Sequence, residues 1–141
     1  MTKSDFASQV GKHIAKYPRI MTEVYRQAAQ ETIKEAQTPT AKGGRMRVRT
    51  GFLINSGIAE LNSIPSGESE PPEGYMKAGW DPQPMVLTIN KATLQDRIVF
   101  GWVANYAIFR EAQDAFLRLA VQNWPQTVNR VAKETERRMR K

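Results

Sequence analysis

The strongest constraint in this sequence is an apolar stripe that runs through its first 28 residues. Its members are three or four positions apart, so they share one face of an α-helix over about six turns. The stripe consists of Phe6, Val10, Ile14, Tyr17, Met21, Val24 and Ala28. A helix with such a face buries it against another element. The stripe therefore predicts an N-terminal helix over residues 1–37 that packs on the rest of the chain.

Pro18 conflicts with this helix. Proline lacks the backbone N–H and crowds the carbonyl group four residues earlier in a helix. We therefore expect a kink or a break at Lys16–Tyr17, which leaves either one long kinked helix or two helices in series. Ser4 is the expected N-cap.

Residues 38–49 read TPTAKGGRMRVR and predict a flexible basic loop. Pro39 and the consecutive glycines Gly43 and Gly44 interrupt regular structure. Its four cations are Lys42, Arg45, Arg47 and Arg49. We expect these side chains to contact an anionic partner, either DNA or acidic residues such as Glu68, Glu70 and Glu73 of a neighbouring subunit.

Residues 50–112 predict a small antiparallel sheet. The best strand candidates are Met85–Ile89 and Ile98–Trp102, which are rich in β-branched and aromatic residues, with 90–97 as the hairpin connection between them. Residues 58–61 and 75–80 are further strand candidates. A short helical turn after Thr50 and a loop over 63–74 complete the region.

Residues 113–141 predict a C-terminal helix with a charged tail that frays beyond Lys133. Asp114 is the expected N-cap, and Pro125 should kink the helix or divide it. The apolar face comprises Phe116, Leu117, Ala120, Val121, Trp124, Val128 and Val131. The whole chain is thus predicted to be one α+β domain, with its N-terminal and C-terminal helices packed on a small antiparallel β-sheet.

The composition argues against an enzyme. The 141 residues include no cysteine and one histidine, His13, so thiol catalysis, thiolate zinc sites and histidine-rich metal sites are excluded. No phosphate-binding or nucleophile-elbow motif is present. We expect no catalytic residues, no cofactor and no metal. No apolar run is long enough to span a membrane, and no secretory signal is expected.

The net charge of +7 is unevenly distributed. Residues 1–49 carry +6, residues 50–129 carry −3 and residues 130–141 carry +4. Basic ends around an acidic middle fit an anionic partner or head-to-tail pairing between subunits. Solubility and solvated helix faces are the alternative explanation.

Two short elements occur in a recognisable order after the N-terminal helix and basic loop. The first, Thr50-Gly51-Phe52-Leu53-Ile54-Asn55-Ser56, follows the loop directly. The second, which reads ANYAIFRE over residues 104–111, follows a predicted strand, and an aromatic-bearing helix closes the chain. This order over residues 5–132 resembles the head–tail joining family of long-tailed bacteriophages, the neck or tail-completion proteins. The glycine that the family usually has soon after Tyr-Ala is missing here.

The resemblance implies a structural virion protein of the bacteriophage neck. Such proteins form a homo-oligomeric ring, commonly six- or twelvefold, that connects the DNA-filled head to the tail during virus assembly. The implied partners are other copies of the chain, the portal or adaptor, the tail-tube or tail-terminator proteins and the genomic DNA in the lumen. The implied location is the virion neck, after assembly in the host bacterial cytoplasm. The expected contact residues are Lys42, Arg45, Arg47, Arg49, Tyr106, Phe109, Arg110 and Glu111.

The alternative hypothesis is a basic nucleic-acid-binding protein. The basic loop would bind phosphates, and Tyr75, Trp80 and Trp102 would stack on bases. For Leu53, Tyr106 and Trp124, a core position and a subunit interface both remain open at this point.

Overall fold

The protein is described here from a computed structural model, which covers the backbone of residues 3–139 and the side chains of residues 18–138. Its described part is an α+β domain with one two-stranded antiparallel sheet, which confirms the predicted fold class. The elements are α1 (Lys3–Ala36), the 3-10 helix η1 (Thr40–Lys42), α2 (Phe52–Asn55), β1 (Gly57–Leu61), α3 (Gln83–Ile89), β2 (Ile98–Trp102), α4 (Ala107–Asp114), α5 (Phe116–Gln122) and α6 (Trp124–Met139).

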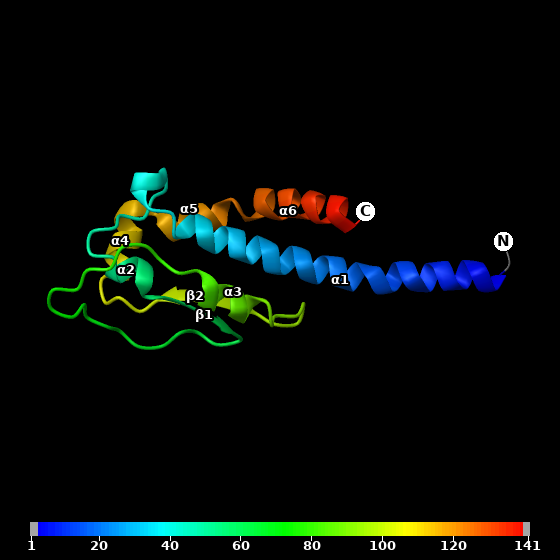
Figure 1. Ribbon diagram of the computed structural model, residues 1–141, viewed down its shortest axis with the longest axis horizontal. Helices are drawn as coiled ribbons and strands as arrows, with labels where there is room; N and C mark the ends of the chain where they lie inside the picture. Colours follow the sequence, from blue (N-terminus) through cyan, green and yellow to red (C-terminus); the bar gives the residue numbers. More distant parts are fainter. Residues whose placement is uncertain (1–2, 140–141) are drawn as a thin grey trace.

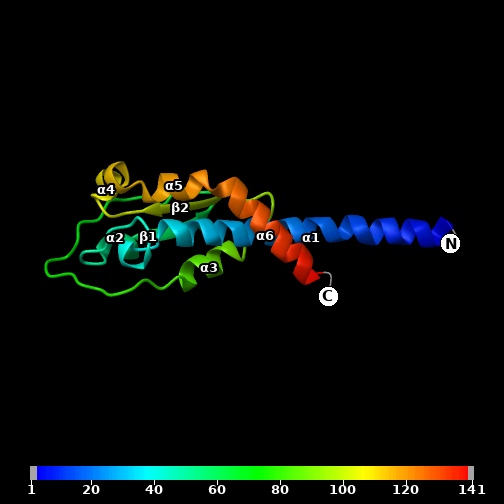
Figure 2. The same ribbon diagram turned by 90° about the horizontal axis from the view of Figure 1, so that it is seen from above.

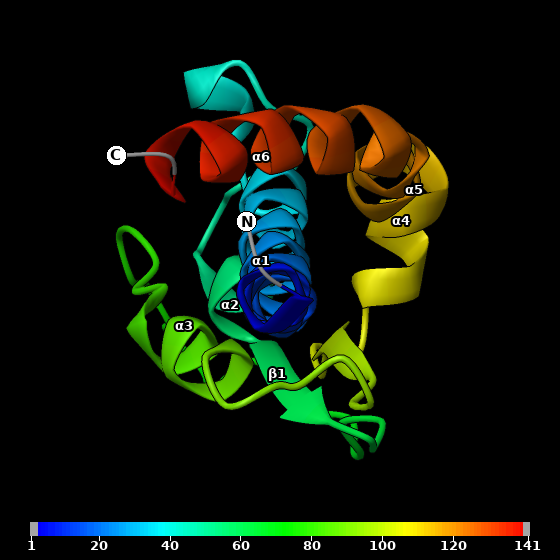
Figure 3. The same ribbon diagram turned by 90° about the vertical axis from the view of Figure 1, so that its right-hand side faces the viewer.

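Helix α1 is the axis of the molecule (Figure 1). Helices α5 and α6 lie along one side of it, and α3 with the two-stranded sheet lies along the other, as the end-on view shows (Figure 3). The N-terminal part of α1 extends well beyond every other element (Figure 2). The domain therefore has a body at one end and a projecting helix at the other.

Helix α1 continues through Pro18, so of the two predicted alternatives the structure shows one helix and no break at Lys16–Tyr17. The Thr22 hydroxyl donates a 2.7 Å hydrogen bond to the Pro18 carbonyl oxygen. The predicted stripe residues before Pro18, the Ser4 cap and the His13 side chain lie outside the described side chains.

The C-terminal half of α1 has small side chains at several of its buried positions. Ala28, Ala29 and Ala36 are buried, so neighbouring helices approach the α1 backbone closely. Helix α6 crosses this surface with a buried face of residues spaced by four, Thr127, Val131 and Thr135. The C-terminal helix thus packs mainly on α1 instead of on the sheet, and it remains helical to Met139 where fraying was predicted.

The sheet pairs β1 with β2, from Gly57 opposite Trp102 to Leu61 opposite Ile98. The predicted strand at Met85–Ile89 is wrong, because this segment forms helix α3. The Asp81 carboxylate accepts a 3.0 Å hydrogen bond from the Gln83 N–H, and Pro84 in the first turn is preset for a helix. Met85 and Ile89, four residues apart, then share the buried face.

Two other predictions for the central region are also wrong. Residues 90–97 are not a hairpin connection, since they join α3 to β2. Residues 75–80 form no strand, and the Lys77 N–H makes one hydrogen bond, 2.9 Å long, to the Thr50 carbonyl. The predicted strand at 58–61 and the loop at 63–74 are confirmed.

Asp114 is not the N-cap that was predicted, because it ends α4 and pairs with Arg110. The following Ala115 is left-handed, with φ 52°. Glu111 caps α5 instead, since its carboxylate accepts the N–H groups of Leu117 and Arg118 at 2.8 and 2.9 Å. The predicted division near Pro125 is confirmed between α5 and α6.

The core has two parts, and both contact strand β2, one through Trp102 and the other through Ile98 and Phe100. One contains Met46, Leu53, Ile54, Ala104 and Phe116, and the other contains Ala29, Ile33, Met85 and Ile89. Leu53 is thus a core residue, whereas Trp124 at the start of α6 is half-buried and belongs to neither part.

Gln37, directly after α1, connects three elements in the interior. Its amide nitrogen donates to the Ile54 carbonyl at 2.8 Å, and its amide oxygen accepts from the Trp102 indole N–H at 2.8 Å. Only 2% of Gln37 is exposed. One buried side chain therefore fixes the positions of α1, α2 and β2 relative to one another.

We expect Gln37→Leu to lower the free energy of unfolding by about 2–4 kcal/mol, because it leaves a buried carbonyl and a buried indole N–H unpaired. Urea unfolding followed by circular dichroism measures the loss. The control is Gln27→Leu on the same helix, whose amide bonds to Glu31 at 3.2 Å in a partly exposed place. A similar effect of both variants would contradict the role assigned to Gln37.

Asp96 organises the turn before β2. Its carboxylate accepts hydrogen bonds from the Asn62 side chain, the Thr93 N–H and the Thr93 hydroxyl. The bond from Asn62 is the largest cause that holds the pKa of Asp96 below its ordinary value, followed by the bonds from Thr93.

Because the folded pKa of Asp96 lies below the unfolded one, its stabilising effect is present above the unfolded pKa. It is lost as the pH falls through the folded pKa. We expect Asp96→Asn to remove this part of the acid sensitivity of folding. An NMR titration of the Asp96 carboxyl carbon should give a midpoint below that of an unstructured aspartate, and a midpoint at or above that value would contradict the assignment.

Candidate functional site

A pocket of about 550 Å³ lies where the end of the basic loop meets α2 and α4. We call it the arginine pocket, because three arginines from two segments line it. Its lining residues are Arg47, Val48, Arg49, Thr50, Gly51, Leu53, Ile54, Pro71, Tyr106 and Arg110. The volume lies within the usual range for ligand sites, roughly 300–1,000 Å³.

The pocket has an apolar floor. Leu53 and Ile54 of α2 are each 4% exposed and belong to the core. Tyr106 packs against the same part of the core, and its ring lies 6.4 Å from that of Phe52. Pro71 contributes its ring from the 63–74 loop. The floor is therefore part of the folded core and is rigidly supported.

One carboxylate balances part of the positive charge. Asp114 accepts a 2.7 Å hydrogen bond from Arg110 and lies 3.7 Å from Arg47. Its side chain is 10% exposed, against 70% for Arg47, so Arg110 is held firmly and Arg47 loosely. Arg49 forms no ion pair with any described residue. The pocket keeps a net positive charge for an anionic group.

The basic loop has more regular structure than its sequence predicts. It contains η1, and the Thr40 N–H bonds to the Met46 carbonyl at 3.0 Å while the Met46 N–H bonds to Thr38 at 3.2 Å. Met46 is fully buried and fixes the loop to the core.

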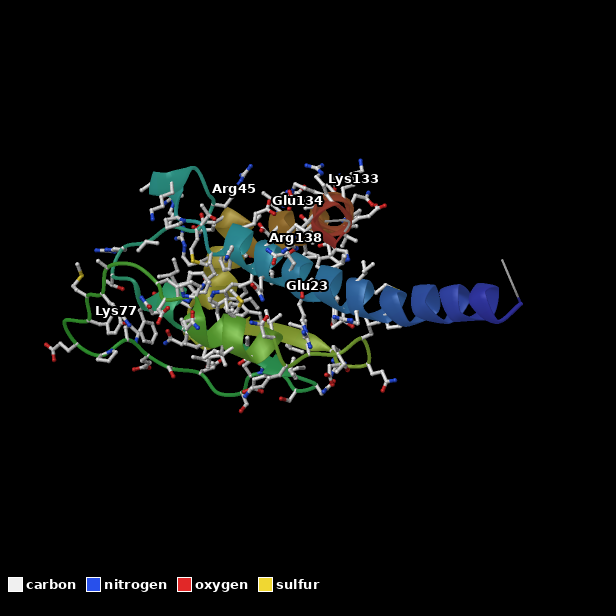
Figure 4. All side chains as sticks on the ribbon, turned by 45° about the vertical axis from the view of Figure 1, so that its right-hand side comes forward. Glu23, Arg45, Lys77, Lys133, Glu134 and Arg138 are labelled. Atoms are coloured by element: carbon white, nitrogen blue, oxygen red, sulfur yellow. The ribbon has the colours of Figure 1, made fainter. Side chains whose placement is uncertain are left out.

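The structure brings together Arg47, Arg49, Tyr106 and Arg110 from the predicted contact residues. It leaves the other four elsewhere. Lys42 and Arg45 are exposed and do not line the pocket, and Figure 4 shows Arg45 on the side of the molecule toward α6. Phe109 is 68% exposed beside the pocket, and the Glu111 carboxylate caps α5.

Sequence reasoning missed the contributions of Val48, Ile54 and Pro71. The sequence of residues 50–56 predicted the short helical turn that forms α2. It gave no sign that Pro71, from the 63–74 loop, lines the same pocket as α2. A short parallel bridge between Ser69 and Ala104 holds the 63–74 loop in this place. In it, the Ser69 N–H bonds to the Val103 carbonyl at 2.7 Å and the Asn105 N–H bonds to the Ser69 carbonyl at 2.9 Å.

The described part of the chain contains no group of three or more His, Asp or Glu side chains arranged to hold a metal ion. None of the described helices is long and apolar enough to cross a membrane.

The arginine pocket has features suited to binding an anionic group with an apolar part.

The aromatic residues proposed for base stacking are engaged in the fold. The Trp102 ring lies 5.0 Å from both Phe100 and Phe116 in edge-to-face contacts, and Tyr75 packs edge-on against Phe52 at 5.3 Å. Trp80 is half-buried and packs against both parts of the core. This placement disfavours a nucleic-acid surface based on these three residues.

Comparisons of the chain with protein-family models, with curated proteins and with solved structures gave no match.

Gly51 lets the chain turn into the pocket. Its φ is +86°, and an added Cβ would collide with the Lys77 carbonyl oxygen. Gly43 also has a φ of +86°, but nothing lies within 4 Å of its Cβ position. The two positions therefore separate the effect of backbone conformation from that of close packing.

We expect Gly51→Ala to destabilise the fold by about 1–3 kcal/mol more than Gly43→Ala does, because overpacking adds to the strain that both variants share. Thermal unfolding of the two variants under the same conditions tests this difference. Equal losses of stability would show that the contact of Gly51 with Lys77 is not tight in solution.

Proposed function

We propose that this protein is a structural subunit of the bacteriophage neck, in which copies of the chain form a ring that joins the head to the tail. The proposal rests on the resemblance carried by residues 50–56 and 104–111. One structural observation supports it most directly, and this is the projecting part of α1 (Figure 2).

The projecting helix needs a partner outside its own subunit. In the views of Figures 1 and 2, no other element lies alongside the first part of α1. The sequence continues the apolar stripe along this part, from Phe6 to Tyr17. An amphipathic helix gains most of its stability from packing its apolar face. A neighbouring subunit supplies that contact in the proposed ring.

A closed ring uses a heterologous interface, in which two different surfaces of one subunit meet. The opposite end of the molecule has suitable exposed residues, since Ile108 and Phe109 of α4 are 74% and 68% exposed. Adjacent large apolar side chains at this exposure are typical of a contact surface. The projecting helix and the α4 end thus lie at opposite ends of the subunit.

In this proposal the protein acts by binding and not by catalysis. The ring contacts the portal or adaptor on one face and the tail-tube or tail-terminator protein on the other, and DNA passes through its lumen. The net charge of +7 still favours the alternative, a nucleic-acid-binding protein. The aromatic residues proposed for base stacking do not favour it, because they pack within the fold.

Immunogold labelling tests the proposal on tailed phage particles from cells that encode this chain. Antibodies raised against the purified protein should label the head–tail junction of intact particles. Particles assembled without the protein should accumulate as separate heads and tails. Label on the capsid or along the tail, or particles that join normally without the protein, would overturn the proposal.

A further inference from the structure

The backbone at the rim of the arginine pocket is free of internal hydrogen bonds. The N–H and C=O groups of Arg47, Val48 and Arg49 have no hydrogen-bond partner among the described residues. The three side chains line the pocket, and Val48 is 41% exposed. This rim offers donors, acceptors and positive charge in one short segment.

The loop over residues 63–74, here called the acidic loop, has the complementary chemistry. Glu68, Glu70 and Glu73 are exposed and form no ion pair with any described residue. The Ser69 backbone is held by Val103 and Asn105, so the loop is fixed to the body between Glu68 and Glu70. The neighbouring carboxylates therefore extend from an anchored backbone.

Within one subunit these two regions touch without pairing. The acidic loop reaches its own pocket through Pro71, yet none of its carboxylates lies within 4.0 Å of a described basic group. The three carboxylates and Arg49 thus remain available for a contact between copies, and Arg47 has only its loose contact with Asp114.

We propose that residues 68–73 of a second copy of the chain bind at the arginine pocket, with their carboxylates on Arg47 and Arg49. This inference rests on the proposed ring, and it identifies the partner of the pocket. The acidic segment lies beside residues 47–49, while its exposed Pro72 ring covers the apolar floor formed by Leu53 and Ile54.

The pocket fits a peptide better than a DNA backbone. A phosphodiester offers only acceptors, so it leaves the free carbonyl groups of residues 47–49 without partners. A peptide offers both N–H and C=O groups to such a segment. In residues 68–73 the N–H groups of Glu68, Glu70 and Glu73 have no backbone partner among the described residues. The apolar floor, formed by Leu53, Ile54 and Pro71, likewise matches a proline ring and not a phosphate.

Charge exchange between Arg49 and Glu70 tests the contact. Arg49→Glu and Glu70→Arg should each reduce incorporation of the chain into particles by at least about tenfold, because each places like charges in contact. The double variant restores an opposite pair and should recover incorporation to within about threefold of the wild type. The control is Arg97→Glu, an exposed arginine that does not line the pocket, which should have no effect.

Two outcomes would overturn this inference. In the first outcome, Arg49→Glu reduces incorporation, Glu70→Arg does not, and the double variant is incorporated no better than Arg49→Glu. This result assigns the pocket to another ligand. A gel-shift assay with duplex DNA then shows whether that ligand is a phosphate backbone. In the other, both single variants are normal. Circular dichroism melts of all variants verify that they fold.

Disulfide trapping gives a second measurement, because the chain has no cysteine of its own. Val48→Cys and Glu70→Cys are made in separate copies, mixed under assembly conditions and oxidised. A crosslinked heterodimer should form well above the level seen for Arg97→Cys mixed with Glu70→Cys. Equal crosslinking of the two mixtures would contradict the contact. Immunogold label at the neck in the same preparation would show that the proposed function survives this failure.

Discussion

The buried Gln37 amide is the interaction on which the rest of the fold depends. It stands where α1 ends, and it ties the Ile54 carbonyl to the Trp102 indole through two 2.8 Å hydrogen bonds. Because α2 supplies the floor of the arginine pocket and β2 leads into Tyr106, the same amide positions both of these parts of the site. A stable, satisfied polar group in the core thereby links the central helix to the proposed binding surface.

The sequence predicted secondary structure correctly where the spacing or type of its apolar residues fits only one kind of element. The α1 stripe predicted a long helix, and the β-branched residues of Ile98–Trp102 predicted a strand, which the structure confirms. The strand predicted for Met85–Ile89 was wrong because a short apolar run suits either a strand or a buried helix. Its helical start depends on Asp81 and Pro84, whose significance appears only in the structure.

The site was partly predictable for the same reason. Arg47 and Arg49 were singled out from the basic loop, and Tyr106 and Arg110 from the 104–111 element, and the fold places all four around one pocket. Pro71 was not predictable, since its position depends on the bridge between Ser69 and Ala104. The capping role of Glu111 was also missed, because the carboxylate reaches the N–H groups of Leu117 and Arg118 across the left-handed Ala115.

The central place of α1 has a consequence for synthesis of the chain. This helix is made before the surfaces that cover it, which belong to α3, α5 and α6 and end as much as about 100 residues later. At translation rates of about 5–20 residues per second, its apolar face waits roughly 5–20 s for those partners. During this interval the nascent chain carries an exposed amphipathic helix, and it is a natural client for the chaperones that protect such surfaces.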